Sequence, residues 1–375
     1  MGHAEKFSWR GMPPSFGATI KLDVYGQNVI GVIQTLDFHY FIEPLGDGLH
    51  ALVELDPTKF PAEAEPLRTV KSMIPEPMKE APIGWNTVLS VPEIDVLVAY
   101  TTAAKNAHDD IEALIGTASG HIDDSISNSD VPAIVNIVHM VEVSYSESGS
   151  LNTDLTRLAG TADYYMDNVH TLRDQYGADL VALIVGSGDN CGIAYLKPSS
   201  NLAFSVTESS CIAGYTFGHE VGHNIGTHHD RATHSNPYFT YGHGYKYSTG
   251  GWRTIMAYAS SVNPETRINY WSNPNVSLWS IPMGTATYED NARVWDDRAA
   301  TVAAFKTPLG PPPSVTITGN TGMMEGGSEM FTANVSGGTS PFSYQWYVRH
   351  ENDLYYSAVG TNSPYYTHTA GSPVW

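Results

Sequence analysis

Two histidines four residues apart are the first feature of this sequence that could carry chemistry. On a helix, His219 and His223 would lie one turn apart on the same face, so that both imidazoles could bind one metal ion. Glu220 would point beside that metal, where a carboxylate can act as a general base. Gly226 favours a left-handed turn that ends the helix, and the turn would bring His229 round as a third ligand. The pattern predicts a catalytic zinc site whose coordination is completed by a water.

Chance is one alternative explanation, because a histidine pair at this spacing also occurs on ordinary amphipathic helices. Gly226 and His229 stand at the fixed offsets that a third ligand requires, which makes a chance match far less frequent. A second alternative is a binding protein with a vestigial zinc site. Glu220 argues against it, because a structural zinc site needs no base and usually has a fourth protein ligand. A serine hydrolase is weaker again, since no G-x-S-x-G motif occurs.

The stretch HEVGHNIGTHH matches HExxHxxGxxH at every fixed position and resembles the metzincin metallopeptidases. Asp230, directly after the third histidine, resembles the reprolysin branch, and we expect it to orient a histidine or anchor a neighbouring turn. An ordinary exposed acid is the alternative. Met256 in the segment TIMAY resembles the methionine turn beneath the metal. Tyr258 follows at the position where astacins and serralysins place a metal-proximal tyrosine, so the resemblance implies a possible hydrogen-bond donor to the reacting carbonyl.

Beyond this motif, the chain resembles the bacterial peptidyl-Asp metallopeptidases. The shared features are the run at 147–166 and the segments CGIAYL, RTIMAY and DNAR. The likeness covers roughly 91–306, with a weaker likeness at 7–66. It implies a secreted zinc endopeptidase that cleaves on the amino side of Asp. A metzincin of broad or different specificity is the alternative that the residues leave open.

Selection of Asp would require a cationic partner in the pocket, ideally the planar guanidinium of Arg. The resemblance implies that the chain around and after the Met-turn builds the pocket wall. Two arginines lie there, Arg253 immediately before TIMAY and Arg267 in RINYWSNP. We predict that one of them selects the substrate. The alternative is that each arginine merely pairs with a nearby carboxylate.

The charge balance limits the classes of partner. The net charge is -20 with only 19 Lys and Arg and no basic run, so neither nucleic acid nor an anionic membrane is expected as a partner. No apolar run approaches the roughly 20 residues of a membrane span. Residues 1–15 lack the apolar centre of a signal peptide, so we expect the chain to start after one. We expect a secreted bacterial monomer that acts on peptides, and no motif indicates calcium.

Only two cysteines occur, Cys191 and Cys211. An even pair close in sequence suits a disulfide in a secreted protein. Two buried free thiols are the alternative. A cysteine nucleophile is less favoured, because neither residue lies in a Cys/His signature.

Strand and helix patterns alternate from Ile94 and predict an α/β (α+β) domain with a mixed, mostly parallel sheet and long helices. One helix is expected at 107–122, another long one at 155–172 and a closing one at 288–306. A strand near 193–196 would be the antiparallel edge of the sheet if the resemblance holds, and an edge can bind an extended peptide. The expected strands are 18–24, 29–33, 37–42, 49–55, 94–100, 135–143, 180–185, 193–196 and 204–207.

Prolines divide the chain into parts. The first part is expected to be an inhibitory propeptide, with an accessory module that does not inhibit as the alternative. The predicted parts are a propeptide-like β segment at 1–66, a Pro-rich linker and processing region at 67–90, the zinc protease domain at 91–307, a second Pro-rich linker at 308–314, and a partial immunoglobulin-like or PKD-like β-sandwich at 315–375.

Overall fold

In a computed structural model, the protein forms two compact units, Met1–Thr307 and Pro308–Trp375. None of the helices in the described part of the chain combines the length and apolarity that a bilayer span requires. The described residues are 6–11, 19–35, 37–56, 59–68, 91–307, 314–319, 327–337, 342, 344, 346–348 and 357–369.

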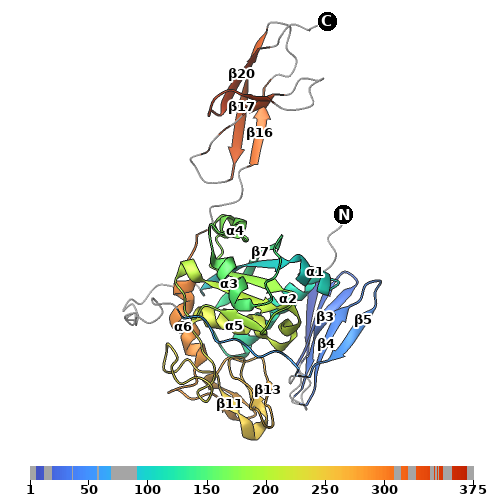
Figure 1. The fold of residues 1–375 in the computed structure, drawn as a ribbon, viewed down its shortest axis with the longest axis vertical. Helices are drawn as coiled ribbons and strands as arrows, with labels where there is room; N and C mark the ends of the chain where they lie inside the picture. The colour runs from blue at the N-terminus through green and yellow to red at the C-terminus, as the bar shows by residue number, and fades with distance from the viewer. Residues whose placement is uncertain are drawn as a thin grey trace. The chain divides into compact units, whose positions relative to one another are not determined.

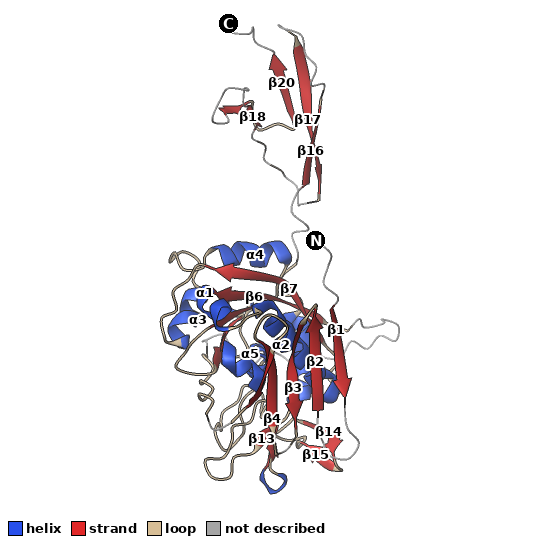
Figure 2. Ribbon diagram, turned by 90° about the vertical axis from the view of Figure 1, so that its right-hand side faces the viewer, coloured by secondary structure: helices blue, strands red, loops and turns tan. Residues whose placement is uncertain are grey.

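A five-stranded sheet lies in the first unit among the helices (Figures 1 and 2). Its strand order is β7-β6-β8-β10-β9. Neighbouring strands pair in parallel except for β9, which is antiparallel to β10 and lies at the edge. The predicted mostly parallel sheet and its antiparallel edge strand are therefore confirmed. The strands are β6 (Glu93–Thr101), β7 (Ile134–Val143), β8 (Leu180–Val185), β9 (Gly192–Ala194) and β10 (Phe204–Glu208).

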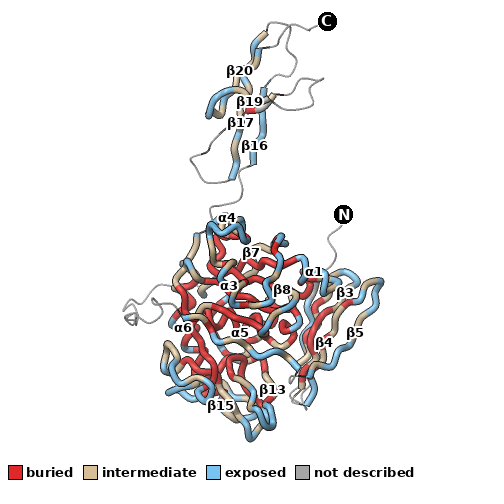
Figure 3. Tube along the Cα trace, viewed as in Figure 1, coloured by how far each residue is buried: buried red, intermediate tan, exposed pale blue. Residues whose placement is uncertain are grey.

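Helices cover both faces of this sheet, because alternate residues of each strand point to opposite sides. Val96 and Val98 belong to the core shared with α2, α5 and α6, whereas Leu97 and Ala99 belong to the core shared with α3 and α4. Figure 3 shows the buried residues concentrated in this part of the unit. The helices are α1 (Thr102–Ala107), α2 (Ile111–Asn128), α3 (Leu151–Ala159), α4 (Asn168–Tyr176), α5 (Thr216–Ile225) and α6 (Asn291–Val302).

The prediction of one long helix at 155–172 is wrong. Gly160 ends α3 with extended backbone, and Tyr164 and Met166 have φ of 69° and 56°, which an α-helix cannot contain. The apolar spacing continued through this break because Met166 is still buried. Likewise, the helix expected from 107 begins only after Asp110, whose side chain caps α2. The closing helix α6 is shorter at both ends than predicted.

The N-terminal segment forms an antiparallel five-stranded meander that packs against α2. The Tyr25 and Lys21 side chains approach the helix where it has no side chain, at Gly116 and Gly120. Lys21 is buried there and lies 3.5 Å from the carboxylate of Asp23. The strands are β1 (Lys6–Gly11), β2 (Thr19–Tyr25), β3 (Asn28–Gln34), β4 (His39–Pro44) and β5 (His50–Glu54).

The remaining described elements of the first unit are short strands and 3-10 helices. They are β11 (Lys246–Tyr247), β12 (Trp252–Arg253), β13 (Thr266–Arg267), β14 (Asn273–Leu278), β15 (Ile281–Met283), η2 (Ser200–Leu202), η3 (Ser209–Gly214) and η4 (Ser248–Gly250).

The second unit contains a three-stranded and a two-stranded antiparallel sheet. Trp346 packs on Tyr366 with ring centroids 5.6 Å apart, and its indole N–H donates to the carbonyl of Ser363. The sandwich assignment stays a prediction, because several connections lie outside the described residues. The strands are β16 (Ser314–Thr318), β17 (Ser328–Ser336), β18 (Trp346–Val348), β19 (Ser357–Val359) and β20 (Tyr365–Thr369).

Candidate metal centre and substrate cleft

Helix α5 carries the predicted motif and is buried along its whole length. It ends at Gly226, whose φ of 126° would strain any other residue. The amide N–H groups of Gly226 and Thr227 both donate to the carbonyl of Gly222 and close the turn. This turn reverses the chain and returns His229 toward the helix.

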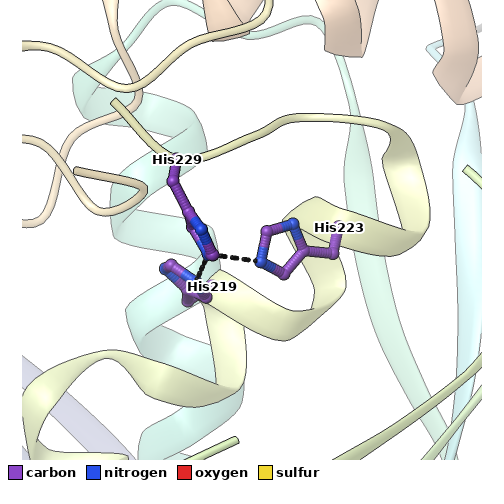
Figure 4. Close-up of side chains that lie close together, drawn as sticks. All are labelled: His219, His223 and His229. Carbon is purple, nitrogen blue, oxygen red and sulfur yellow. Dashed lines mark hydrogen bonds between the residues drawn. The ribbon is translucent and has the colours of Figure 1, made fainter. Parts of the chain in front are cut away.

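Three imidazoles converge beside α5 (Figure 4). Nε2 of His229 lies 3.2 Å from Nε2 of His219 and 3.0 Å from Nε2 of His223. The opposite nitrogen of each helical histidine is 3.0 Å from a backbone carbonyl, that of Ile255 for His219 and that of Thr227 for His223. A carbonyl only accepts hydrogen bonds, so both Nδ1 atoms are protonated and both Nε2 atoms present lone pairs.

Lone pairs that point at one another need a cation between them, because two nitrogens without protons cannot form a hydrogen bond. All three rings are buried, and burial lowers the pKa of each, that of His229 to about 3, so the rings stay neutral. Nδ1 of His229 faces a carboxylate oxygen of Glu65 at 3.5 Å. Three neutral nitrogens with protein partners behind them are the donor set that zinc takes in catalytic sites. The cluster therefore fits zinc.

Glu220 lies beside this cluster, with both carboxylate oxygens buried and without a hydrogen-bond partner among the described residues. A side chain at Gly192 of the edge strand would collide with it, since a Cβ there would lie 2.4 Å from Oε1. Burial and the nearby Glu63 carboxylate raise the pKa of Glu220 well above its ordinary value, and Arg267 opposes the shift. An orphaned buried carboxylate next to a metal site suits a group that exchanges protons.

Met256 is fully buried in a turn that the amide of Ala257 closes by donating to the carbonyl of Thr254. The preceding residue, Ile255, supplies the carbonyl that accepts from His219. The structure thus places the predicted Met-turn directly against one metal-binding ring.

Asp230 binds the chain on the far side of that turn. It accepts from the amide of Tyr258 at 3.0 Å and from the hydroxyl of Thr233 at 2.8 Å, and Lys246 lies 3.6 Å away. Burial alone would raise its pKa, but these hydrogen bonds and Lys246 lower it. The Tyr258 ring lies against His229, with centroids 4.1 Å apart. Asp230 therefore links the segment after His229 to the residue that follows the Met-turn.

The two candidate arginines are cross-strand neighbours, Arg253 on β12 and Arg267 on β13. The guanidinium of Arg253 is buried and donates to the carbonyls of Glu265 and Ala257. The guanidinium of Arg267 donates to the carbonyl of Gly214 at 3.0 Å and lies 2.7 Å from a carboxylate oxygen of Glu63. Arg253 is therefore bound to backbone, whereas Arg267 presents a cation to a carboxylate.

A cavity of about 260 Å³ adjoins these arginines. Because Tyr258 also lines it, the cavity opens beside the metal-binding rings. Other residues that line it are His39, Phe60, Glu63, Thr216, Arg253 and Arg267.

Residues 59–68 cross this cleft, and we call them the cleft strap. The amide of Ala64 donates to the carbonyl of Gly192, and the amide of Leu67 donates to the carbonyl of Ala194. Leu67 forms a parallel bridge with Tyr195. The strap therefore occupies backbone groups of the edge strand β9, and Leu67, the first residue of the predicted linker, is part of this contact. The residues from 69 to 90 lie outside the described part.

The sequence did not single out Glu63, Glu65 or Thr216, although all three reach the centre of the site. Thr216 is the first residue of α5, and its hydroxyl donates to Glu63 at 2.9 Å. Glu65 lies 2.7 Å from a ring nitrogen of His234. Isolated Glu and Thr residues have no diagnostic spacing. The one available signal was the placement of acidic residues in a Pro-rich segment ahead of a protease.

The predicted disulfide is confirmed: Cys191 and Cys211 are joined, with Cα atoms 5.5 Å apart. The bond connects the start of β9 to η3, the segment directly before α5. It therefore holds the edge strand beside the metal-binding helix.

Sequence comparisons with known proteins identify the family of this chain, and one solved structure is also similar. A family model described as metallo-peptidase family M12 matches residues 92–272. A peptidyl-Asp metalloendopeptidase of Stenotrophomonas maltophilia strain K279a is 38% identical over 297 residues, covering 75% of this chain and 69% of that protein. One from Xanthomonas campestris pv. campestris is 37% identical over 287 residues, covering 75% and 68%. Metalloproteinase-II from Bacteroides fragilis has 14% identity and a TM-score of 0.37, covering 60% of this chain and 73% of that structure.

Proposed function

Since this chain belongs to metallopeptidase family M12, whose zinc endopeptidases hydrolyse peptide bonds, we propose that it cleaves proteins on the amino side of Asp. The single observation that carries this specificity is the ion pair between Arg267 and a carboxylate in a cavity beside the metal-binding histidines. The names of the relatives support the same preference.

The charge of the cavity supports an acidic substrate residue. Arg253 and Arg267 are direct cross-strand partners, and two like charges at this position repel each other. A substrate carboxylate that binds Arg267 relieves this repulsion, whereas an apolar substrate side chain does not. The planar guanidinium also matches a carboxylate better than Lys would.

Different residues of the site have different roles in the hydrolysis of the peptide bond. Zinc held by His219, His223 and His229 would supply a Lewis acid and would make a bound water more acidic. Glu220 accepts a proton from the attacking water at a carboxylate oxygen and passes it to the nitrogen of the leaving amine. Its raised pKa favours the first of these transfers, since the carboxyl holds a proton more readily. The hydroxyl of Tyr258, which already donates to a carbonyl in the cleft, stabilises charge on the carbonyl oxygen.

Residues 1–66 act as a propeptide, and the protein is secreted. The support for a propeptide is the cleft strap, which covers the edge strand where an extended substrate would add. The disulfide supports an oxidising compartment. Cleavage in the Pro-rich stretch after the strap would convert the precursor into the active monomer.

A digest of a peptide library by the processed enzyme tests the specificity. We expect Asp to be enriched at the first position after the cut, and chelation of zinc to stop all cleavage. Broad cleavage without that enrichment would leave a zinc endopeptidase of different specificity.

A further inference from the structure

Glu63 of the cleft strap makes contacts that none of its neighbours makes. Its side chain is 5% exposed, and one carboxylate oxygen accepts from both Arg267 at 2.7 Å and Thr216 at 2.9 Å. Thr216 is the first residue of α5, so the carboxylate also lies at the positive end of the helix dipole. Three independent features, a guanidinium, a hydroxyl and a helix N-terminus, therefore converge on one acidic side chain.

The backbone of Glu63 is bound as well. The hydroxyl of Tyr258 donates to the Glu63 carbonyl at 2.9 Å. The amide of the next residue, Ala64, donates to the edge strand at Gly192. Glu63 thus occupies the Arg267 end of the pocket with its carboxylate and the carbonyl-binding position with its own carbonyl.

We propose that Glu63 is an internal ligand of the pocket that selects the substrate acid, and that Thr216 forms this pocket together with Arg267. The strap inhibits the uncut chain by competing with substrate for that pocket. This inference rests on the proposed function, because it takes the Arg267 cavity as the specificity pocket.

The direction of the strap explains why it is bound and not cleaved. Cleavage on the amino side of an acidic residue requires the carbonyl of the preceding residue at the reacting position. The strap instead presents the carbonyl of Glu63 itself to Tyr258. Leu67 of the strap pairs with Tyr195 in parallel, so the strap runs in the same direction as the chain at the edge of the sheet. The bond before Glu63 is therefore not the one offered for attack.

Hydrogen exchange in the full chain tests the proposal without relying on turnover. The chain carries Glu220→Gln so that it cannot cut itself, and the measured groups are the strap amides of Ala64 and Leu67. Glu63→Gln and Arg267→Met should each speed their exchange about tenfold or more, since each removes a charged hydrogen bond. Thr216→Val should act in the same direction with a smaller effect. The matched control is Glu54→Gln on the exposed face of β5, which should change nothing.

The double variant Glu63→Gln/Arg267→Met should exchange no faster than the faster single variant, because both changes break one contact. Unchanged exchange in Glu63→Gln, or fully additive effects in the double variant, would overturn the proposal. If zinc chelation alone freed the strap while Arg267→Met did not, Glu63 would be held by the metal and the pocket assignment would fail.

The outcomes separate this proposal from the proposed function. If Glu63→Gln frees the strap but the library digest shows no enrichment of Asp, the internal-ligand proposal is supported and the proposed specificity for Asp is wrong. If Asp is enriched but Glu63→Gln has no effect on the strap, the internal ligand alone is wrong.

Discussion

The backbone amide of Tyr258 donates to the carboxylate of Asp230 at 3.0 Å, although the two residues are 28 positions apart. This bond joins the residue after the third metal-binding histidine to the end of the Met-turn. His219 contacts the same turn through the carbonyl of Ile255. The positions of two ligands are thus fixed relative to one turn, and Asp230 joins the residue after that turn to the residue after His229.

Replacement of Asp230 by Ala should weaken zinc binding by about 10- to 100-fold, as is typical for residues that orient metal ligands. The variant loses the bonds from Tyr258 and Thr233 but keeps all three histidines. Competition with a chromophoric chelator measures the change. Zinc affinity equal to that of the parent would show that Asp230 does not orient the site.

Glu220→Ala should retain one equivalent of zinc and lose turnover by about 10²- to 10⁴-fold or more, the range for a missing general base. The three ligand nitrogens do not depend on Glu220, whose oxygens have no described partner. Metal analysis and kcat on one peptide substrate check both parts. Substantial remaining activity would assign the base to another group.

The two arginines offer a matched pair of variants. Arg267→Met should reduce cleavage before Asp by about two orders of magnitude, since a charged hydrogen bond contributes roughly 1.5–3 kcal/mol, and should affect other peptides less. Arg253→Met should instead lower the free energy of unfolding, because its guanidinium satisfies the carbonyls of Glu265 and Ala257. Specificity constants and urea unfolding distinguish the two. An exchange of these phenotypes would make Arg253 the selecting residue.

Loss of the disulfide should destabilise the first unit by about 3 kcal/mol, the value for a loop of this size. Cys191 and Cys211 are separated by 20 residues, and the amide of Cys191 also donates to the strap at Ala62. The Cys191→Ser/Cys211→Ser variant should therefore unfold at lower denaturant and hold the strap less firmly. Chemical denaturation of the zinc-loaded chain, with and without reductant, provides the comparison.

Stability should fall as the pH drops from about 6.5 to about 4, partly because of His39. Burial lowers the pKa of His39 to about 4, so the unfolded chain binds a proton in this window while the folded chain does not. The full loss is on the order of 3 kcal/mol, from about 1.4 kcal/mol per pKa unit. Urea unfolding at several pH values in the parent and in His39→Gln isolates the contribution. An unchanged pH dependence in the variant would exclude His39.

The metal centre could be predicted from sequence because its geometry is local. His219, Glu220 and His223 lie on one helix, and Gly226 fixes the turn that returns His229. The helical period and one backbone conformation are enough to bring these groups together. The break between α3 and α4 was missed because the buried side chain of Met166 continued the apolar spacing across it.

The substrate pocket could be predicted only in part, because it depends on contacts between distant segments. Arg267 was a candidate from its position after the Met-turn, but its partner Glu63 lies 204 residues earlier. Arg253 and Arg267 pair through two parallel strands of only two residues each. Strands this short have no alternation pattern that the sequence could reveal. A threonine at the start of a helix, such as Thr216, ordinarily indicates only a helix boundary.

The fit of the N-terminal meander on α2 has a consequence for the order in which the chain matures. Gly116 and Gly120 leave a hollow that Tyr25 and Lys21 fill, so this face of the helix is shaped for the meander. The ribosome completes the meander before α2, so the meander is already present to shield that face when the helix forms. A cut further along the chain leaves the meander attached through the same hollow. If residues 1–66 are a propeptide, as we propose, activation then also requires dissociation of the meander, and dilution shifts that equilibrium toward the free enzyme.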